Sequence, residues 1–282
     1  MTTKQASCYL RDALVPIYGQ HEAAAMIAVI FDEVMHYSQV DVVLRADSEL
    51  PEFVPALFEQ IVARLQRHEP LQYIMGAARF HGHRFRVTPA TLIPRPETEM
   101  LIDIIADDHR SATDLRVLDI GTGSGCIAVS LALALKFPIV SATDVSPEAL
   151  DVARENARNL RARVSFIEQD ILVAALPVRP CFDIIVSNPP YVCLSEQAQM
   201  EPNVLDYEPH IALFVTDDDP LLFYRAIIRY AAKALAQGGR LYLECNRRFT
   251  ADVASIALTA GFSSAATVID GFAAPRFVSA IR

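Results

Sequence analysis

The sequence lacks an apolar run long enough to cross a bilayer. Its longest apolar stretch, residues 126–135, is interrupted only by Ser130 and followed by Lys136 and Pro138. That is about half of the roughly 20 residues that a membrane-spanning helix needs. The first residues lead into an amphipathic pattern, without the apolar core and small-residue cleavage site of a secretory signal. We therefore expect a cytoplasmic protein that binds no membrane.

Cysteine is scarce, and the number and spacing of the cysteines argue against structural zinc sites and disulfide bonds. The five cysteines are Cys8, Cys126, Cys181, Cys193 and Cys245. Their odd number and the absence of a CxxC pair argue against a zinc ribbon and a disulfide framework, so we interpret them as packing residues. His81 and His83 are another candidate metal pair. Alternation along a strand would place both on one solvated face with no third ligand nearby in sequence, so we expect no metal site.

Basic residues are fewer than acidic ones. The chain has 25 Lys and Arg against 34 Asp and Glu, a net charge of −9. Tight, sequence-independent binding to nucleic acid depends on clustered cations that displace counterions from phosphates. The charge therefore favours a protein substrate over bulk DNA, and we expect no stable nucleic-acid binding.

The 282 residues, 52% of them hydrophobic, suffice for two domains. A helical period runs from residue 4 to about 67 and predicts a small all-helical domain over residues 1–75. The apolar positions that carry this period are Leu10, Leu14, Ile17, Phe53, Leu57, Ile61 and Leu65.

Residues 76–100 have a different pattern. Residues 80–87 alternate around Gly82, which predicts a β-hairpin linker. A proline-rich loop follows, in which Pro94 and Pro96 restrict the backbone and hold Arg95 and Glu97 in one orientation.

Residues 101–282 alternate between strand and helix patterns. This order predicts an α/β fold, a Rossmann-like, doubly wound and mostly parallel sheet. We expect strands at residues 116–120, 139–144, 164–167, 182–186 and 240–244. We expect helices at 125–135, 147–160 and 220–236, and a closing hairpin from 267–269 and 276–281.

A glycine-rich turn follows the first of these strands. Asp119-Ile120 leads into Gly121, Thr122, Gly123, Ser124 and Gly125. The glycines let the strand turn sharply into a helix and leave the backbone open to a nucleotide-like ligand. The spacing does not match GxGxxG, which weakens a dinucleotide interpretation.

Two acidic residues end the next two strands. Asp144 is placed to accept hydrogen bonds from both hydroxyls of a ribose, as acidic residues do in nucleotide-binding folds. Asp170 is placed for an adenine amino group, and the alternative is a helix cap or a loop turn.

Asn188, Pro189, Pro190 and Tyr191 follow the strand at 182–186. The Asn188 side-chain oxygen and the Pro189 carbonyl can each accept one N–H of a planar NH2 group, and the prolines add no competing donor. Tyr191 would form a wall beside the flat group. With both protons held, the nitrogen lone pair can face a methyl donor, so the slot predicts methylation of an amide or amino nitrogen.

These motifs together resemble the HemK-type peptide chain release factor glutamine methyltransferases, the PrmC family. The resemblance covers most of the chain, through residues 69–76, 92–99, 117–125, 188–191, 207–209, 212–213 and 238–244. It implies a class I S-adenosylmethionine-dependent methyltransferase fold over residues 101–282. One departure follows Glu244, where the family usually continues with a glycine and later a glutamine, but this chain has Cys245-Asn246-Arg247-Arg248-Phe249.

The resemblance also implies roles for the parts. The N-terminal domain helps to dock the release factor, whose Gly-Gly-Gln loop delivers the glutamine. The glycine loop, Asp144 and Asn188 contact S-adenosylmethionine, and residues 188–191 contact the glutamine.

Other activities fit parts of the pattern. A flipped adenine presents the same NH2 group as glutamine, so a DNA adenine methyltransferase is one alternative. A methyltransferase for another protein glutamine, such as one in a ribosomal protein, is a second. An NAD-dependent protein or a nucleotide sensor on the same fold is a third. We take a monomer as the default state.

Overall fold

The computed structural model describes residues 1–271 and 273–282 and contains two compact units. The smaller unit comprises residues 1–77 together with 202–207, and the larger one comprises residues 78–201 and 208–282. These boundaries differ from the expected ones, because nearly all of the expected linker belongs to the larger unit. The short segment 202–207 packs with the helices, where the Tyr207 hydroxyl donates to the Arg67 carbonyl at 2.7 Å.

The smaller unit is helical. Its helices are α1 (Thr3–Met35), α2 (Gln39–Leu44), α3 (Val54–Leu65), α4 (Leu71–Met75) and α8 (Pro202–Leu205). Leu10 and Leu14 are buried in its core as expected, together with Phe31 and Phe58, whose rings meet edge to face. The expected apolar face was wrong at Ile17 and Phe53, which are 38% and 65% exposed. Phe53 precedes α3, which begins only at Val54.

Helix α1 is the one helix within the described residues that is long and apolar enough to cross a membrane by length and composition. Only 28% of its most apolar window is buried. Gly19 interrupts it with non-helical angles, φ 75° and ψ 168°. Each half is therefore shorter than the roughly 20 residues that a span needs.

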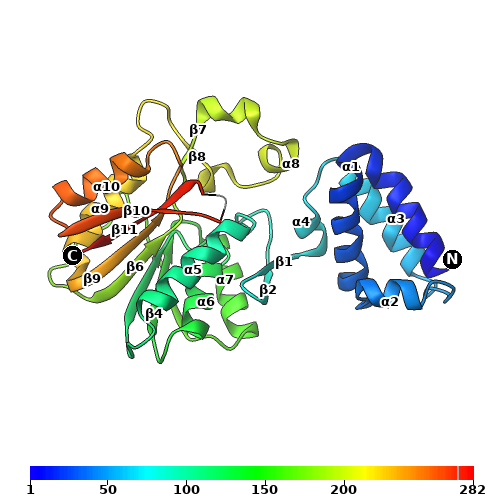
Figure 1. Ribbon diagram of the computed structural model, residues 1–282, viewed down its shortest axis with the longest axis horizontal. Coiled ribbons are helices and arrows are strands. Elements are labelled where there is room, and N and C mark those ends of the chain that lie inside the picture. Colours follow the sequence, from blue (N-terminus) through cyan, green and yellow to red (C-terminus); the bar gives the residue numbers. More distant parts are fainter. Residues whose placement is uncertain (272) are drawn as a thin grey trace. The chain divides into compact units, whose positions relative to one another are not determined.

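The larger unit is built on a seven-stranded sheet in the order β10-β11-β9-β6-β3-β4-β5 (Figure 1). The strands are β3 (Arg116–Ile120), β4 (Ile139–Asp144), β5 (Val164–Glu168), β6 (Phe182–Ser187), β9 (Leu235–Glu244), β10 (Ser264–Ile269) and β11 (Pro275–Ile281). All neighbouring pairs are parallel except those of β11, which runs antiparallel to β9 and β10. This confirms the doubly wound, mostly parallel fold and its closing hairpin.

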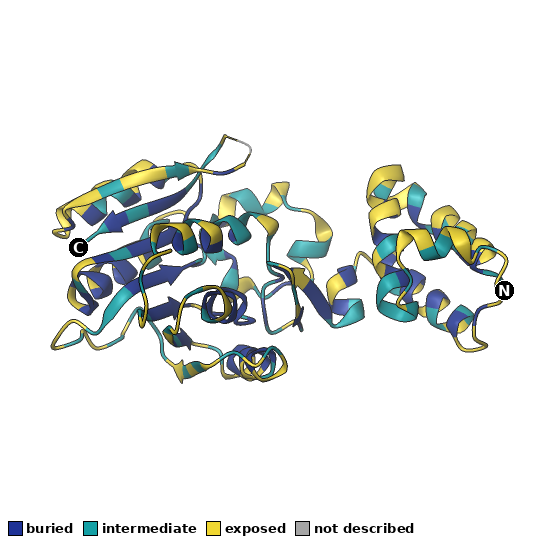
Figure 2. Cartoon of the chain, turned by 60° about the horizontal axis from the view of Figure 1, so that its bottom comes forward, coloured by how far each residue is buried: buried dark blue, intermediate teal, exposed yellow. Residues whose placement is uncertain are grey.

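Helices cover both faces of this sheet (Figure 1). On one face α9 (Leu222–Ala234) and α10 (Thr250–Thr259) pack on strand residues such as Leu118 and Ile120. On the other, α5 (Pro96–Asp108), α6 (Cys126–Ala134) and α7 (Pro147–Asn159) pack on residues such as Val117. Figure 2 shows the central strands largely in the colour of burial, as expected for a parallel sheet between two helix layers.

Chain order reverses between β3 and β6. The chain runs from β3 to β4 and β5 on one side, then returns to form β6 on the other side of β3. The Ser187 hydroxyl donates to the Ile120 carbonyl at 2.6 Å and joins the carboxyl ends of these two strands. Ligands of open α/β sheets bind at such a reversal, outside the carboxyl ends of the strands.

Two local expectations were wrong. The helix expected at residues 220–236 ends at Ala234, because Leu235 already pairs with Phe182 as the start of β9. The expected placement of His81 on a strand also fails. The hairpin strands are β1 (Ala77–Phe80) and β2 (His83–Arg86), and His81 lies in the turn with a positive φ of 47°.

Candidate active site

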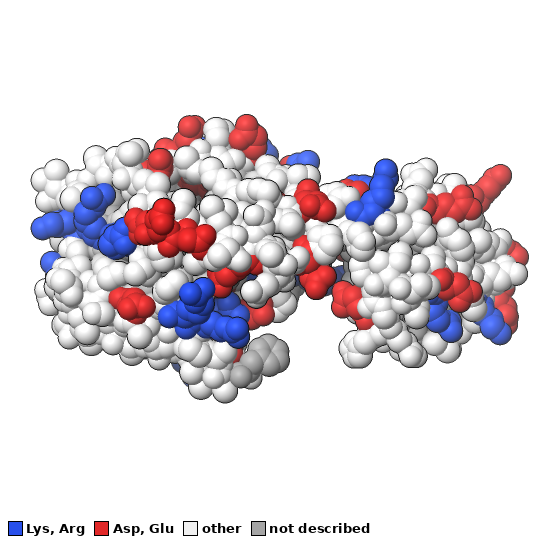
Figure 3. All heavy atoms as spheres, turned by 90° about the horizontal axis from the view of Figure 1, so that it is seen from above, with Lys and Arg blue, Asp and Glu red and all other residues white. Residues whose placement is uncertain are grey.

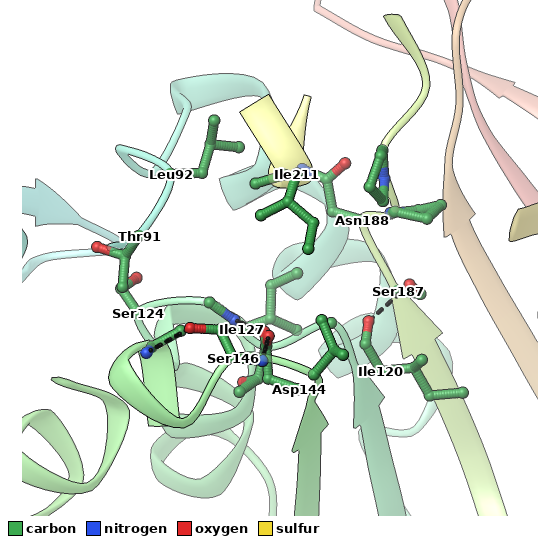
Figure 4. A pocket seen from close by; sticks show the side chains of 18 of the residues that line it. Thr91, Leu92, Ile120, Ser124, Ile127, Asp144, Ser146, Ser187, Asn188 and Ile211 are labelled. Carbon is green, nitrogen blue, oxygen red and sulfur yellow. Dashed lines mark hydrogen bonds between the residues drawn. The ribbon is translucent and has the colours of Figure 1, made fainter. Parts of the chain in front are cut away.

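A cavity of about 320 Å³ opens at the carboxyl ends of β3, β4, β5 and β6. This volume lies within the range of about 300–1,000 Å³ that is usual for small-molecule sites. Figure 4 shows Asn188 and Ile211 on one side of it and Thr91 and Ser124 on the other. Of the predicted site residues, the lining includes Gly121, Thr122, Gly123, Ser124, Asp144, Asp170, Asn188, Pro189 and Pro190.

The glycine loop forms the floor on the β3 side. Gly121, Gly123 and Gly125 all have positive φ, between 55° and 81°. A side chain at Gly123 would meet no atom within 4 Å, so its backbone faces open space. Gly125 does not line the cavity, and a Cβ there would lie 3.0 Å from the Ala153 Cβ. A glycine is needed at this position because α7 approaches the backbone closely, not because a ligand does.

Asp144 lies at the end of β4 and faces this loop. Its carboxylate accepts hydrogen bonds from the Gly123 amide at 2.8 Å and from the Ser146 amide at 3.0 Å. The pKa of Asp144 is raised above its ordinary value, because the effect of burial is larger than the opposing effect of these backbone hydrogen bonds. A half-buried carboxylate beside an open glycine loop suits a ligand with a ribose and an adjacent polar chain.

Asp170 also lines the cavity, beyond the end of β5. Its Oδ1 accepts from the Leu172 amide at 2.9 Å, which is the geometry of a loop turn. Within the described residues no hydrogen bond to its Oδ2 occurs, and a contact with an adenine amino group stays a prediction.

Asn188 lies directly after β6, where the sequence pattern placed it. Its Nδ2 donates to the Thr98 hydroxyl at 3.3 Å. No hydrogen bond to Oδ1 occurs within the described part of the chain. Pro189 and Pro190 continue the lining next to Asn188.

Tyr191 occupies a different position from its neighbours. It is absent from the residues that line the cavity, and its hydroxyl donates to Glu244 at 3.1 Å. Burial, together with the nearby Glu244 charge, raises the pKa of Tyr191, so the hydroxyl keeps its proton. A wall contact with substrate stays a prediction.

The sequence analysis did not identify two buried residues that contact this slot. The Thr98 hydroxyl donates to Glu244 at 2.7 Å, and the two residues are 2% and 1% exposed. Burial raises the pKa of Glu244, against the hydrogen bonds from Thr98 and Tyr191 and the attraction of Arg276. A charged residue at the carboxyl end of a buried strand was the signal for Glu244.

Asp119 is a further buried acid, at the end of β3. Its Oδ2 accepts from the Thr122 hydroxyl at 2.6 Å and from the Ala128 amide at 3.2 Å, whereas Oδ1 has no partner within residues 1–271 and 273–282. Burial raises the pKa of Asp119 to about 7. It fixes the turn from the strand into α6.

The proline-rich segment is attached to the sheet unit by Glu208. This carboxylate accepts from the Ile93 amide at 3.0 Å and from the Arg95 guanidinium at 2.6 Å, and its side chain is 1% exposed. The restrained segment contributes Leu92, Pro94 and Arg95 to the lining. Arg95 is therefore held in one orientation by its hydrogen bond to Glu208, in addition to the stiffness of the prolines.

Asn246 takes part in the site at the place where the chain departs from the family pattern. Its Nδ2 donates to the Tyr191 carbonyl at 3.2 Å and to Glu196 at 3.1 Å. Its Oδ1 accepts from the Arg248 amide at 3.0 Å. The substituted loop therefore supports the backbone just after the proline pair.

One residue of the candidate metal pair lies beside an acidic side chain. His81 lies 3.1 Å from Asp103, an exposed partner. Within the described residues, no group of three or more His, Cys, Asp or Glu side chains could hold a metal ion.

The sheet order, the glycine loop and the acidic residue that ends β4 define a class I S-adenosylmethionine-dependent methyltransferase. Solved structures share this fold. Thermus thermophilus RsmC, a 16S rRNA N2 G1207 methyltransferase in complex with AdoMet and guanosine, has 18% identity over 73% of this chain and 49% of that one, with a TM-score of 0.53. The hMettl16 catalytic domain has 19% identity over 70% and 74%, with a TM-score of 0.54.

Sequence comparisons give the family. Residues 96–205 match the methyltransferase small domain, and residues 3–76 match the PrmC N-terminal domain. The release factor glutamine methyltransferase of Bacteroides thetaiotaomicron is 42% identical over 98% of this chain and 99% of its own length. That of Flavobacterium psychrophilum is 43% identical over 83% of each. The chain belongs to the release factor glutamine methyltransferase family.

Proposed function

We propose that this protein transfers a methyl group from S-adenosylmethionine to the side-chain amide nitrogen of the glutamine in the Gly-Gly-Gln motif of peptide chain release factors. The observation that carries the proposal is Asn188, whose Oδ1 is free of hydrogen bonds from the described residues at the edge of the cavity. The 42% identity to a release factor glutamine methyltransferase supports the choice of substrate.

The cavity residues would hold the cofactor, which supplies a methyl group on a positively charged sulfur. Gly121 and Gly123 leave their backbone open to it, and Asp144 would accept hydrogen bonds from its ribose hydroxyls. Asp170 would accept from the adenine amino group.

Asn188 and Pro189 would hold the glutamine amide. Asn188 Oδ1 accepts one N–H, and the Pro189 carbonyl accepts the other. An amide nitrogen is a weak nucleophile because its lone pair is delocalised, so holding both protons turns the lone pair toward the methyl group. Such positioning supplies up to about 7–11 kcal/mol in favourable reactions. The same two acceptors would stabilise the positive charge that develops on nitrogen as the bond between the methyl carbon and the sulfur breaks. The sulfur would leave as a neutral thioether, and the nitrogen would release one of its two protons to solvent. Pro190 and Tyr191 would complete the slot, with Tyr191 packed beside the flat amide.

The first test is methylation of purified release factor with labelled cofactor, followed by peptide mass mapping. We expect one methyl group on the Gly-Gly-Gln glutamine. We expect Asn188→Ala to lower the rate by about 100-fold or more, as loss of a transition-state hydrogen bond does. Cofactor affinity, measured by calorimetry, should change much less. A methyl group on any other residue would contradict the proposed substrate.

We further propose a cytoplasmic monomer that acts on protein and binds neither membranes nor nucleic acid stably. The net charge of −9 supports this, and the face in Figure 3 carries Lys and Arg in small groups interspersed with Asp and Glu. A DNA gel shift and a DNA methylation assay should both be negative. Sedimentation velocity should give a single species of the chain's own mass, and the protein should stay in the supernatant with anionic vesicles.

A further inference from the structure

A chain of hydrogen bonds reaches Asn188 from the interior of the sheet unit. Glu244, at the end of β9, accepts from the Thr98 hydroxyl at 2.7 Å through Oε2. Thr98, in the first turn of α5, accepts in turn from Asn188 Nδ2 at 3.3 Å. Three residues far apart in sequence are thus joined by two hydrogen bonds that end at the side-chain amide of Asn188.

The Thr98 hydroxyl determines which group donates and which accepts in this series of hydrogen bonds. A threonine hydroxyl has one proton, and here that proton is donated to a carboxylate. Its oxygen can then only accept from its second partner. Asn188 must therefore turn its NH2 group toward Thr98, which leaves Oδ1 as the acceptor available to a ligand.

We infer that Thr98 and Glu244 are positioning residues that fix the side-chain amide of Asn188 with its oxygen toward the amide of the substrate. This inference rests on the proposed function and names the residues that orient its acceptor. Neither residue carries out chemistry on the glutamine. Without them, Asn188 could rotate by half a turn and present a donor to the NH2 group, which would repel it.

The same carboxylate also restrains the other end of the Asn188–Tyr191 tetrapeptide. Glu244 Oε1 accepts from the Tyr191 hydroxyl at 3.1 Å. Glu244 is 1% exposed, so water does not compete for its two oxygens. The buried Glu244 carboxylate therefore restrains both end residues of the tetrapeptide, Tyr191 directly and Asn188 through Thr98. A carboxylate with a packing role only would not need hydrogen bonds to both.

The central variant is Thr98→Val, which keeps the shape of the side chain but removes the hydroxyl. We expect the single-turnover rate of methyl transfer to fall about tenfold, the equivalent of one neutral hydrogen bond. Affinity for S-adenosylmethionine should change less than about twofold, because the glycine loop and Asp144, which we propose hold the cofactor, are unaltered. Thr98→Ser keeps the hydroxyl and should restore most of the rate.

Thr250→Val is the matched control, because Thr250 is also buried but lies in α10, outside the hydrogen-bonded chain. It should leave the rate unchanged. Glu244→Gln is a second variant in the chain itself. Its NH2 group must donate to one neighbour, so we expect a loss similar to that of Thr98→Val.

A nuclear magnetic resonance measurement separates this inference from the proposed activity. The side-chain 15N and 1H signals of Asn188, assigned by their disappearance in Asn188→Ala, should shift in Thr98→Val but not in Thr98→Ser or Thr250→Val. If the wild-type protein fails to methylate release factor, the proposed function is wrong and these shifts still test the orientation. Unchanged Asn188 signals in Thr98→Val, or equal rate losses for Thr98→Val and Thr98→Ser, would overturn the inference.

Discussion

Asp119 illustrates how a single buried carboxylate couples the cofactor loop to the stability of the fold. It accepts from Thr122 and Ala128 at the turn from β3 into α6, and it is 0% exposed. Burial disfavours its charged form and raises its pKa from the ordinary 3.8 to about 7. The folded protein therefore takes up this proton more readily than the unfolded chain does.

The pH dependence follows from that difference. The contribution of Asp119 to stability is fully present below about pH 4 and is lost as the pH rises through about 7. Asp119→Asn cannot ionise, so the free energy of unfolding of the wild type should fall relative to that variant by about 1–3 kcal/mol between pH 4 and pH 8. Urea denaturation of both proteins at each pH measures this. Parallel pH profiles for the two proteins would contradict it.

At the level of elements, the segment that walls the cavity depends on one ion pair. Glu208 is buried and holds both the Ile93 amide and the Arg95 guanidinium. Proline stiffness alone fixes backbone angles within residues 93–96 but does not attach them to the sheet unit. The side chain that does so lies more than a hundred residues further along the chain.

We expect Arg95→Met to leave the Glu208 charge buried with only one backbone donor. The free energy of unfolding should fall by about 1–3 kcal/mol, as for a buried acceptor that loses its partner. Cofactor affinity should fall as well, because Arg95 and its neighbours line the cavity. Urea denaturation and calorimetry measure the two effects. Arg110→Met removes an exposed pair with Asp107 and should change neither.

At the scale of the whole molecule, the boundary between the two units does not follow the order of the sequence. Residues 202–207 lie within the methyltransferase half of the sequence but pack with the N-terminal helices. Tyr207 makes the hydrogen bond to Arg67, and Glu208, the next residue, holds the proline-rich segment of the sheet unit. The chain thus passes from one unit to the other between two anchored residues.

Tyr207→Phe removes the anchor in the smaller unit without changing the ring. We expect amide hydrogen exchange in residues 202–207 to rise about tenfold, since one neutral hydrogen bond is lost. Exchange in β3 and β6 should not change. Tyr9→Phe, on α1, is the matched control and should leave residues 202–207 as protected as in the wild type. Equal exchange in Tyr207→Phe and wild type would show that packing alone holds the segment.

Much of the fold was predictable because its signals are local. The strands at residues 116–120 and 139–144 were predicted with the bounds that the structure has, since buried parallel strands are short apolar runs with clear ends. The glycine loop, Asp144 and Asn188 were placed correctly at strand ends. The errors at Phe53, at His81 and at the end of the helix expected over residues 220–236 occurred where a helix start, a tight turn and strand pairing override the periodic pattern.

The fold class, the cofactor loop and the acceptor slot after β6 could be derived from the amino-acid sequence, because each depends on residues that are neighbours in the chain. What holds the slot in place could not, because it depends on how distant segments pack. Thr98 lies 90 residues from Asn188 and 146 residues from Glu244 along the chain, and no local pattern joins them. The sheet brings them together, since its strand order places β6 beside β9 and α5 packs over both. A hydroxyl and a carboxylate buried together must then satisfy one another, and that requirement orients the amide of Asn188.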